Sequence, residues 1–288
     1  MKQTNLIFVA FIAIAIIFSG CKKEEFMVTF HPNGGAGTMP AQTFEAGKSQ
    51  TLTANAFTNK GYTFTGWNTN QKGTGKAYKD KEMISAVNNM TLYAQWVVMD
   101  IDGNIYETVK IGNQLWLKQN LRTTKYRTGE SIPVVAHDGH WETTTAPAMC
   151  YINISNATVS IHGALYNGYA AAGGKLCPEG WRLPSESDWE QLANYLGGKE
   201  IAGYKLKTTN GWSFHGTNNG NGSNESGFTA YPVGCRYMTG DFIGWGLQTI
   251  FWNSTEGSFQ YLLYSDKRLH TANDEHQSVG CSVRCIKE

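Results

Sequence analysis

Cysteine is the residue type with the widest chemical potential in this 288-residue chain, which contains six of them. Five lie in the C-terminal half, at Cys150, Cys177, Cys235, Cys281 and Cys285. The alternation of a β-strand over residues 279–286 places Cys281 and Cys285 on one face. Four strand residues span roughly 13 Å, whereas Cα atoms joined by a disulfide lie within about 7 Å of each other. These two cysteines therefore cannot bond to each other, and each needs a partner from elsewhere.

Histidines are the other candidate ligands, but their spacing completes no metal site. His137 and His140 lie in a polar stretch, as do His270 and His276, and no further cysteine, histidine or carboxylate pattern joins either pair. The local sequence also contains no Ser-His-Asp arrangement, phosphate-binding loop or paired-carboxylate motif. The sequence therefore predicts no catalytic residue, no metal ligand and no cofactor, with His137 and His140 exposed in a loop.

The N-terminus has the pattern of a targeting segment. Lys2 precedes an apolar stretch at residues 6–18, which is typical of a secretory signal peptide and short for a membrane span. The run Phe-Ser-Gly-Cys that ends at Cys21 resembles a bacterial lipobox, which predicts a signal peptide over residues 1–20 and a lipid on Cys21. The alternative is an ordinary cleaved signal with a chance cysteine. The charged residues that follow, within a tether over residues 21–26, resemble the signal that sends lipoproteins to the outer face of the outer membrane.

These features predict an outer membrane lipoprotein exposed on the cell surface, where the remaining five cysteines meet an oxidising environment. The net charge is +1 and charged residues make up 16% of the chain, so no basic patch indicates a nucleic-acid partner. After the signal peptide, no run approaches the roughly 20 apolar residues that a membrane helix needs. The length allows two domains.

Residues 27–97 alternate as β-strands do and contain VTFHPNGG, GYTFTGWNT and MTLYAQW in that order. This ordered set resembles the Listeria–Bacteroides repeat, also called the internalin B-repeat, over nearly all of the range. The resemblance implies a small β-grasp domain that acts as a spacer or interaction module on cell surfaces. Tyr62, Phe64, Trp67 and Trp96 could form a platform for stacking sugars, but we expect them to form the core of this small domain.

A boundary is expected at residues 97–99, and the run Asp100-Ile101-Asp102-Gly103-Asn104 follows it. An EF-hand calcium loop needs glycine at its sixth position and a bidentate carboxylate at its twelfth. Counted from Asp100, the twelfth residue is Ile111, so the run does not fit a calcium loop. Asp102 and Gly103 are instead predicted to form a hairpin turn.

Residues 176–189 carry the most informative local pattern. Pro178 and Pro184 bracket a short extended segment, because the residue before a proline avoids helical dihedral angles. Ser185 is a candidate N-cap, and Asp188 three residues later gives a capping-box pattern. One apolar face of a helix follows at i, i+3, i+4 and i+7 spacing, formed by Trp189, Leu192, Ala193 and Leu196. A strand that carries a cysteine therefore leads into a capped helix whose tryptophan faces a core.

The run CPEGWRLPSESDWEQL, which begins at Cys177, resembles the signature of the Fibrobacter succinogenes major paralogous domain. It also resembles, more distantly, the WRLPTEAEWE run of the formylglycine-generating enzymes. Residues 100–126 and the closing SVGCSVRCIKE resemble other parts of the same domain, so the resemblance covers nearly all of residues 99–288. It implies a C-type-lectin-like fold. The predicted fold class is thus mostly β with minor α: a small β-grasp repeat domain followed by a disulfide-stapled C-type-lectin-like domain.

The resemblance also implies how the cysteines pair. In the lectin-like fold the last strand is tied to the cysteine-bearing region of the first helix, which favours Cys177–Cys285. Cys281 stands where the family usually has phenylalanine and Cys235 is equally unusual, so the second expected pair is Cys235–Cys281. Cys150 is then left over, and exchanging Cys150 for Cys177 stays open because connectivity cannot be deduced from sequence.

The enzyme chemistry of the distant relatives is not carried over to this chain. Formylglycine-generating enzymes bind copper with a close cysteine pair before the last strand, whereas residues 269–278 contain no cysteine. The carboxylate and amide ligands of calcium-dependent lectins are also missing around Pro232, and the run at Trp252 keeps only Trp-Asn.

We therefore expect a non-catalytic binding or adhesion module that recognises a glycan or a protein. Loops on a rigid scaffold would supply the contacts, at residues 132–160, 218–226 and 238–247. Aromatic residues dominate binding surfaces, so the candidate contact residues are Trp141, Tyr237 and Trp245. The alternatives are a metal-dependent enzyme of the formylglycine-generating type and a structural cell-surface component. A content of about one copper or iron atom per chain would favour the enzyme. Self-assembly without a ligand would favour the structural role.

Overall fold

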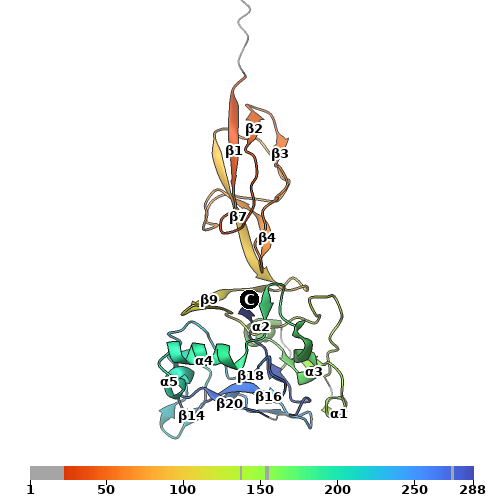
Figure 1. The fold of residues 1–288 in the computed structure, drawn as a ribbon, viewed down its shortest axis with the longest axis vertical. Helices are drawn as coiled ribbons and strands as arrows, with labels where there is room; N and C mark the ends of the chain where they lie inside the picture. Colours follow the sequence, from red (N-terminus) through yellow and green to blue (C-terminus); the bar gives the residue numbers. More distant parts are fainter. Residues whose placement is uncertain (1–22, 137, 153–155, 274–275) are drawn as a thin grey trace, which may run out of the picture.

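The computed structural model describes residues 23–136, 138–152, 156–273 and 276–288, in a narrow N-terminal part and a broader C-terminal part (Figure 1). Strands dominate both parts and the helices are short. The predicted class, mostly β with minor α, is confirmed. Among the described residues, no helix is long and apolar enough to cross a membrane.

The N-terminal part is a mixed sheet with its own core. Its strands lie in the order β2–β1–β7–β4–β5, with β1 parallel to β7, and their bounds are β1 (Glu25–His31), β2 (Gln42–Glu45), β4 (Thr63–Asn68), β5 (Ala77–Tyr78) and β7 (Met90–Met99). A separate pair consists of β3 (Gln50–Thr51) and β6 (Met83–Ile84). Trp67 is completely buried, with its ring centre 4.9 Å from that of Phe30. The aromatic residues of this part therefore form its core, except that Tyr62 packs against the core of the C-terminal part.

Strand β7 connects the two parts without a break. Leu92 and Ala94 lie in the N-terminal core, whereas Val98, near the end of the same strand, lies in the C-terminal core. The end of β7 pairs with β8 (Ile105–Tyr106) across a turn in which Gly103 has a φ of 84°. The predicted hairpin turn is confirmed, and the expected boundary at residues 97–99 falls inside a continuous strand.

Two sheets build the C-terminal part. One has the order β13–β22–β10–β9, with bounds β9 (Thr108–Ile111), β10 (Gln114–Leu117), β13 (Trp181–Arg182) and β22 (Ile286–Lys287). The other has the order β11–β12–β21–β18–β19–β20, with bounds β11 (Met149–Cys150), β12 (Leu165–Tyr166), β18 (Gln248–Trp252), β19 (Phe259–Leu263), β20 (His270–Ala272) and β21 (Cys281–Ser282). The last residues of the chain thus enter both sheets, and a large aromatic core lies around them.

The signature run forms the predicted strand, cap and helix. Helix α4 spans Glu186–Tyr195, and its N-cap Ser185 accepts a hydrogen bond at Oγ from the backbone N–H of Asp188. The Asp188 carboxylate accepts one in return from the backbone N–H of Ser185, at 2.7 Å. Trp189 and Leu192 are buried as expected. The other α-helices are α1 (Asp138–Glu142), α2 (Asn156–His162), α3 (Gly168–Ala171) and α5 (Lys199–Leu206).

Direct contacts fix the repeat against the C-terminal part. Trp181 donates a hydrogen bond from Nε1 to the carbonyl oxygen of Gly61 at 2.8 Å. The Lys287 ammonium lies 4.0 Å from the ring centre of Tyr62 and donates to the carbonyl oxygen of Lys60 at 2.9 Å. A Cβ on Gly180 would come within 2.7 Å of the Cα of Gly61, so only glycine permits this approach.

Candidate functional site

Large exposed apolar side chains lie on or near two short hairpins that contain β14 (Phe214–His215) and β16 (Cys235–Arg236). These two strands are at the end of the molecule away from β1 (Figure 1). We call this the distal apolar surface. Its members are between 38% and 67% exposed and are Phe214, Tyr237, Phe242, Ile243, Trp245 and Leu247. Single exposed apolar residues are common on proteins, but exposed apolar residues grouped on neighbouring hairpins are a feature of interaction sites, which makes this surface the candidate site.

Two short hairpins carry this surface. Strand β16 (Cys235–Arg236) pairs with β17 (Phe242–Ile243), and β14 (Phe214–His215) pairs with β15 (Asn218–Asn219). The backbone N–H of Ser213 donates to the carbonyl oxygen of Gly246 at 2.8 Å, which holds the two hairpins side by side.

Glycine at position 234 is required for this packing. Gly234 has a φ of 68°, and a Cβ there would lie 2.2 Å from the carbonyl oxygen of Ile243. A side chain at this position would push the end of β17 away from the start of β16.

Arg236 supports the surface from below. It is fully buried, and its guanidinium donates to the carbonyl oxygens of Val135 and Ala136, and to that of Gly240 at 2.8 Å. The guanidinium carbon lies 4.6 Å from the ring centre of Trp141 and 5.0 Å from that of Phe242. Arg236 therefore links the chain before α1 to the exposed hairpin through hydrogen bonds and cation–π contacts.

The prediction that Trp141 contacts a ligand is wrong. Its side chain is completely buried, and its indole N–H donates to the carbonyl oxygen of Ser278 at 2.7 Å. The stretch around it forms helix α1, not an open loop, because the tryptophan fills a small core with Val233 and Leu165.

Tyr237 and Trp245, the other two predicted contact residues, are exposed as members of the distal apolar surface, one on each side of strand β17 in the sequence. Behind Trp245, the His162 ring centre lies 4.9 Å from the indole, at an interplanar angle of 90°. Burial lowers the pKa of His162, so the ring facing Trp245 is neutral at neutral pH. The tryptophan is thus held from behind by an uncharged ring, and its other side is exposed.

Sequence reasoning did not single out Phe214, Phe242, Ile243 or Leu247. The run from residue 240 to 247 alternates these apolar residues with glycines, in a stretch expected to be a loop. Apolar residues in a glycine-rich loop cannot all turn inward, and this signal could have identified three of the four. Phe214 joins them only through the pairing of two hairpins that are distant in the sequence.

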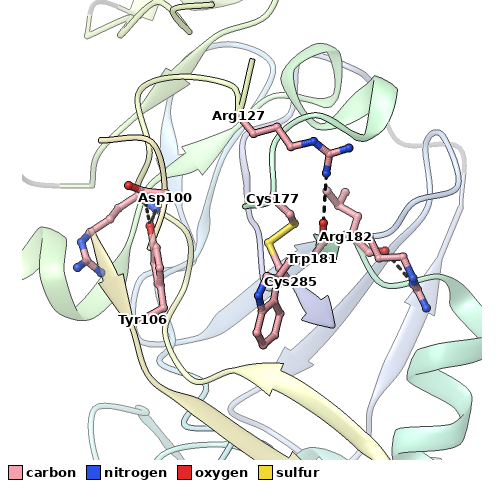
Figure 2. The surroundings of a disulfide bond; sticks show 9 residues. Asp100, Tyr106, Arg127, Cys177, Trp181, Arg182 and Cys285 are labelled. Carbon is pink, nitrogen blue, oxygen red and sulfur yellow. Dashed lines mark hydrogen bonds between the residues drawn. A yellow bond between two sulfur atoms is a disulfide. The ribbon is translucent and has the colours of Figure 1, made fainter. Parts of the chain in front are cut away.

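The expected disulfide Cys177–Cys285 is present, with Cα atoms 6.0 Å apart. Figure 2 shows Trp181 beside this disulfide, with the Arg127 guanidinium donating to the Trp181 carbonyl oxygen. The disulfide is therefore next to strand β13, whose Trp181 contacts the repeat.

The second expected disulfide, Cys235–Cys281, is not formed in the structure. Both side chains are buried, and Cys235 Sγ accepts a hydrogen bond from Gln248 Nε2 at 3.7 Å. Cys150 is a buried thiol, and burial raises its pKa to about 12, so it is protonated at neutral pH.

The side chains that could bind a metal are either engaged in hydrogen bonds or too far from one another to share an ion. Both carboxylate oxygens of Asp100 accept hydrogen bonds within its own turn, including one from the Tyr106 hydroxyl at 2.6 Å. In the described part of the chain, no three His, Cys, Asp or Glu side chains are grouped as a metal site would require. His137, expected in an exposed loop with His140, lies outside the described residues, as does Cys21.

Comparison with known protein families identifies both parts of the chain. A model of the Fibrobacter succinogenes major domain matches residues 109–287, well over half of the sequence. The chain belongs to this family. In this Fibrobacter succinogenes major domain protein, residues 26–95 also match the Listeria-Bacteroides repeat domain. None of the curated proteins or solved structures matches it. The two families indicate a surface-associated bacterial protein.

Proposed function

We propose that this protein is a surface-anchored, non-catalytic binding module whose distal apolar surface contacts another protein. The observation that carries the proposal is the position of the two hairpins that bear that surface, at the end of the described part of the molecule away from β1 (Figure 1). A lipid on Cys21 would tether the chain to the outer membrane, and the repeat would hold the C-terminal part away from it. The apolar surface then points toward the surroundings of the cell.

A protein partner fits this surface better than a glycan does. Ile243 and Leu247 add exposed aliphatic area in the same segment of the chain as Phe242 and Trp245. Aromatic side chains surrounded by apolar area are the usual centre of protein interfaces, whereas sugars also need convergent hydrogen-bonding groups. The neutral His162 ring behind Trp245 fixes one such aromatic side chain before binding.

The test is an array of extracellular and host-matrix proteins, with a glycan array beside it, probed with residues 23–288. Trp245→Ala and Phe242→Ala should each weaken binding at least about tenfold, the usual effect of removing a central aromatic contact. The matched control is Tyr195→Ala, which removes an aromatic side chain that is 67% exposed on helix α4.

The outcomes separate the candidate functions. Binding to a protein that is lost in the Trp245 and Phe242 variants alone supports the proposal. Binding to glycans only, or to no ligand with a well-folded protein, contradicts it. Self-association lost in the same variants would show a structural role, and copper or iron near one per chain would favour an enzyme.

A further inference from the structure

Cys235 and Cys281 lie opposite each other where β16 runs beside the start of β21. The backbone N–H of Arg236 donates to the carbonyl oxygen of Gly280 at 2.9 Å, and the N–H of Gly280 donates back to the carbonyl oxygen of Arg236 at 2.7 Å. These two residues are therefore a hydrogen-bonded pair of an antiparallel ladder. One residue further along each strand, the same register places Cys235 opposite Cys281, as the adjoining non-hydrogen-bonded pair.

A non-hydrogen-bonded pair has the geometry that a disulfide bond needs. Its Cα atoms are typically about 4.5 Å apart, and its two side chains point to the same face of the sheet. Cysteines joined by a disulfide have Cα atoms about 4.4–6.8 Å apart. Cys235 and Cys281 are also buried in the same hydrophobic core. The two side chains can therefore be joined without a change in the pairing of the strands.

Cys150 does not compete for either cysteine, because it lies on the other face of the sheet. Cys281 is aligned with Tyr166 of β12, whereas Cys150 is aligned with Leu165, the preceding residue of the same strand. Successive residues of a strand point to opposite faces. Cys150 accordingly packs with Leu165 and Trp141 in the small core, and not in the core that contains Cys281.

This cysteine pair lies at the base of a hairpin that carries the distal apolar surface. Cys235 is the first residue of β16 and pairs with Ile243 of β17, which is a member of that surface. In the described part of the chain, β16 and β17 form a two-stranded sheet of their own. A two-stranded hairpin is only marginally stable by itself. How firmly β16 is attached to β21 therefore decides how firmly the hairpin is held.

We propose that Cys235 and Cys281 are a redox pair whose disulfide locks the β16–β17 hairpin to β21. The two sulfur atoms are not bonded in the structure, which thus shows the pair before oxidation. Cys235 is 2% exposed and Cys281 is 0% exposed, so the reaction takes place during folding or when the hairpin opens.

The oxidant is a disulfide, carried by a small molecule or by another protein. The thiolate of one cysteine attacks this disulfide and displaces one thiol, which leaves a mixed disulfide. The thiolate of the other cysteine then attacks the mixed disulfide and releases the second thiol. One S–S bond forms and one breaks, and the two cysteine protons end on the two released thiols. The two cysteines are oxidised and the external disulfide is reduced.

The first test is a disulfide map of residues 23–288, folded in a mixture of reduced and oxidised glutathione. The protein is then denatured, its remaining thiols are alkylated and it is digested with trypsin. Cleavage after Arg284 separates Cys281 from Cys285, so each has its own peptide. We expect a linked pair of peptides that carry Cys235 and Cys281, in addition to the disulfide already described.

The second test is amide hydrogen exchange of the oxidised protein. Cys235→Ser cannot form the bond but keeps a hydrogen-bond acceptor for the Gln248 side chain. In the wild type, the amides of Arg236 and Gly280 should exchange at least about tenfold more slowly than in this variant, because the cross-link suppresses local opening. Cys150→Ser makes the same change at a buried cysteine on the other face of the sheet, so it is the matched control and should exchange as the wild type does.

A bond between Cys235 and Cys281 together with slower exchange supports the proposal. If Cys235→Ser does not fold, Cys281→Ala takes its place in the comparison. Alkylation of both cysteines in a folded, oxidised protein, a bond from either of them to Cys150, or unchanged exchange in spite of the bond would overturn the proposal. Neither measurement uses a binding partner, so the result is independent of the function proposed for the distal apolar surface.

Discussion

Three buried cations in the described C-terminal part are held by neutral hydrogen-bond acceptors. Arg284 is 1% exposed and donates to Asn120 Oδ1 and to the carbonyl oxygen of Phe228, and its guanidinium carbon lies 4.4 Å from the Phe228 ring centre. Arg236 and Lys207 are bonded to carbonyl oxygens in the same way. Burial lowers the pKa of Arg284 to about 9. Such positions demand a particular donor geometry as well as a positive charge.

Arg284→Lys should therefore destabilise the protein although the charge is kept. A single ammonium cannot reach both the Asn120 side chain and the Phe228 carbonyl, so one buried acceptor is left unpaired. We expect a loss of about 2–3 kcal/mol in the free energy of unfolding, measured by urea denaturation. Arg127→Lys, at a partly exposed side chain, is the control and should cost much less. Equal losses in the two variants would contradict this account.

Lys207 should make stability depend on alkaline pH. Its ammonium donates to the carbonyl oxygens of Leu263 and Asp266, at 2.9 and 2.8 Å, and burial lowers its pKa from 10.5 to about 8. The unfolded chain binds this proton more tightly than the folded chain does. The cost of the buried charge is therefore full below pH 8 and is relieved as the pH rises from about 8 towards 10.5.

The measurement is the free energy of unfolding of the wild type and of Lys207→Met across that pH range. The wild type should gain stability relative to the variant as the pH rises, since the variant lacks the titrating group. A constant difference between the two proteins would mean that the pKa of Lys207 is not lowered.

At the scale of elements, the capped helix α4 anchors the family signature. Asp188 both completes the cap of Ser185 and accepts two hydrogen bonds from Arg182. Burial opposes its ionisation, but the hydrogen bonds from Arg182 and Ser185 outweigh burial and hold the pKa of Asp188 below its usual range. One carboxylate therefore joins the strand β13 to the helix that follows it.

Asp188→Asn should cost about 1–2 kcal/mol of stability, because the cap is weakened and Arg182 loses its charged partner. The stabilisation by the carboxylate is present above the ordinary pKa of 3.8 and is lost as the pH falls through the lowered value. Thermal unfolding at neutral pH and near pH 3 would measure both effects. Glu190→Gln, on an exposed side of the same helix, is the control and should change neither.

At the scale of the whole molecule, the repeat and the C-terminal part should tumble as one body. Strand β7 contributes to both cores, and Trp181 and Lys287 bond to the backbone of the repeat at Gly61 and Lys60. Both residues lie on strands close in sequence to the Cys177–Cys285 disulfide, so the joint is beside a covalent cross-link. A rigid joint would keep the distal apolar surface at a fixed distance from the first strand, β1, and so from the lipid anchor that we propose at Cys21.

NMR relaxation tests this directly. One rotational diffusion tensor should describe both parts of the wild type. In the Tyr62→Ala, Lys287→Ala double variant, the cation–π contact is removed, and we expect the two parts to need separate tensors. Lys72→Ala, in a turn of the repeat, is the control. Independent tumbling of the wild type would show that β7 and the Gly61 contact do not hold the parts together.

The sequence by itself determined the features that depend on neighbours along the chain. The Ser185 cap, the buried face of α4 and the turn at Gly103 follow from residue preferences and periodicity over a few positions, and the structure has all three. The pairing of Cys177 with Cys285 was predicted from the family resemblance and is also present. These features are local or belong to the whole family.

Only the tertiary structure decided which loop side chains are buried. Trp141 looked like an exposed contact, but its indole bonds to Ser278, 137 residues further along the chain. The distal apolar surface likewise exists only because the hairpin at Phe214 meets the hairpin at Trp245. A side chain in a loop is buried or exposed according to what packs over it, and residues that are distant in the sequence provide that cover.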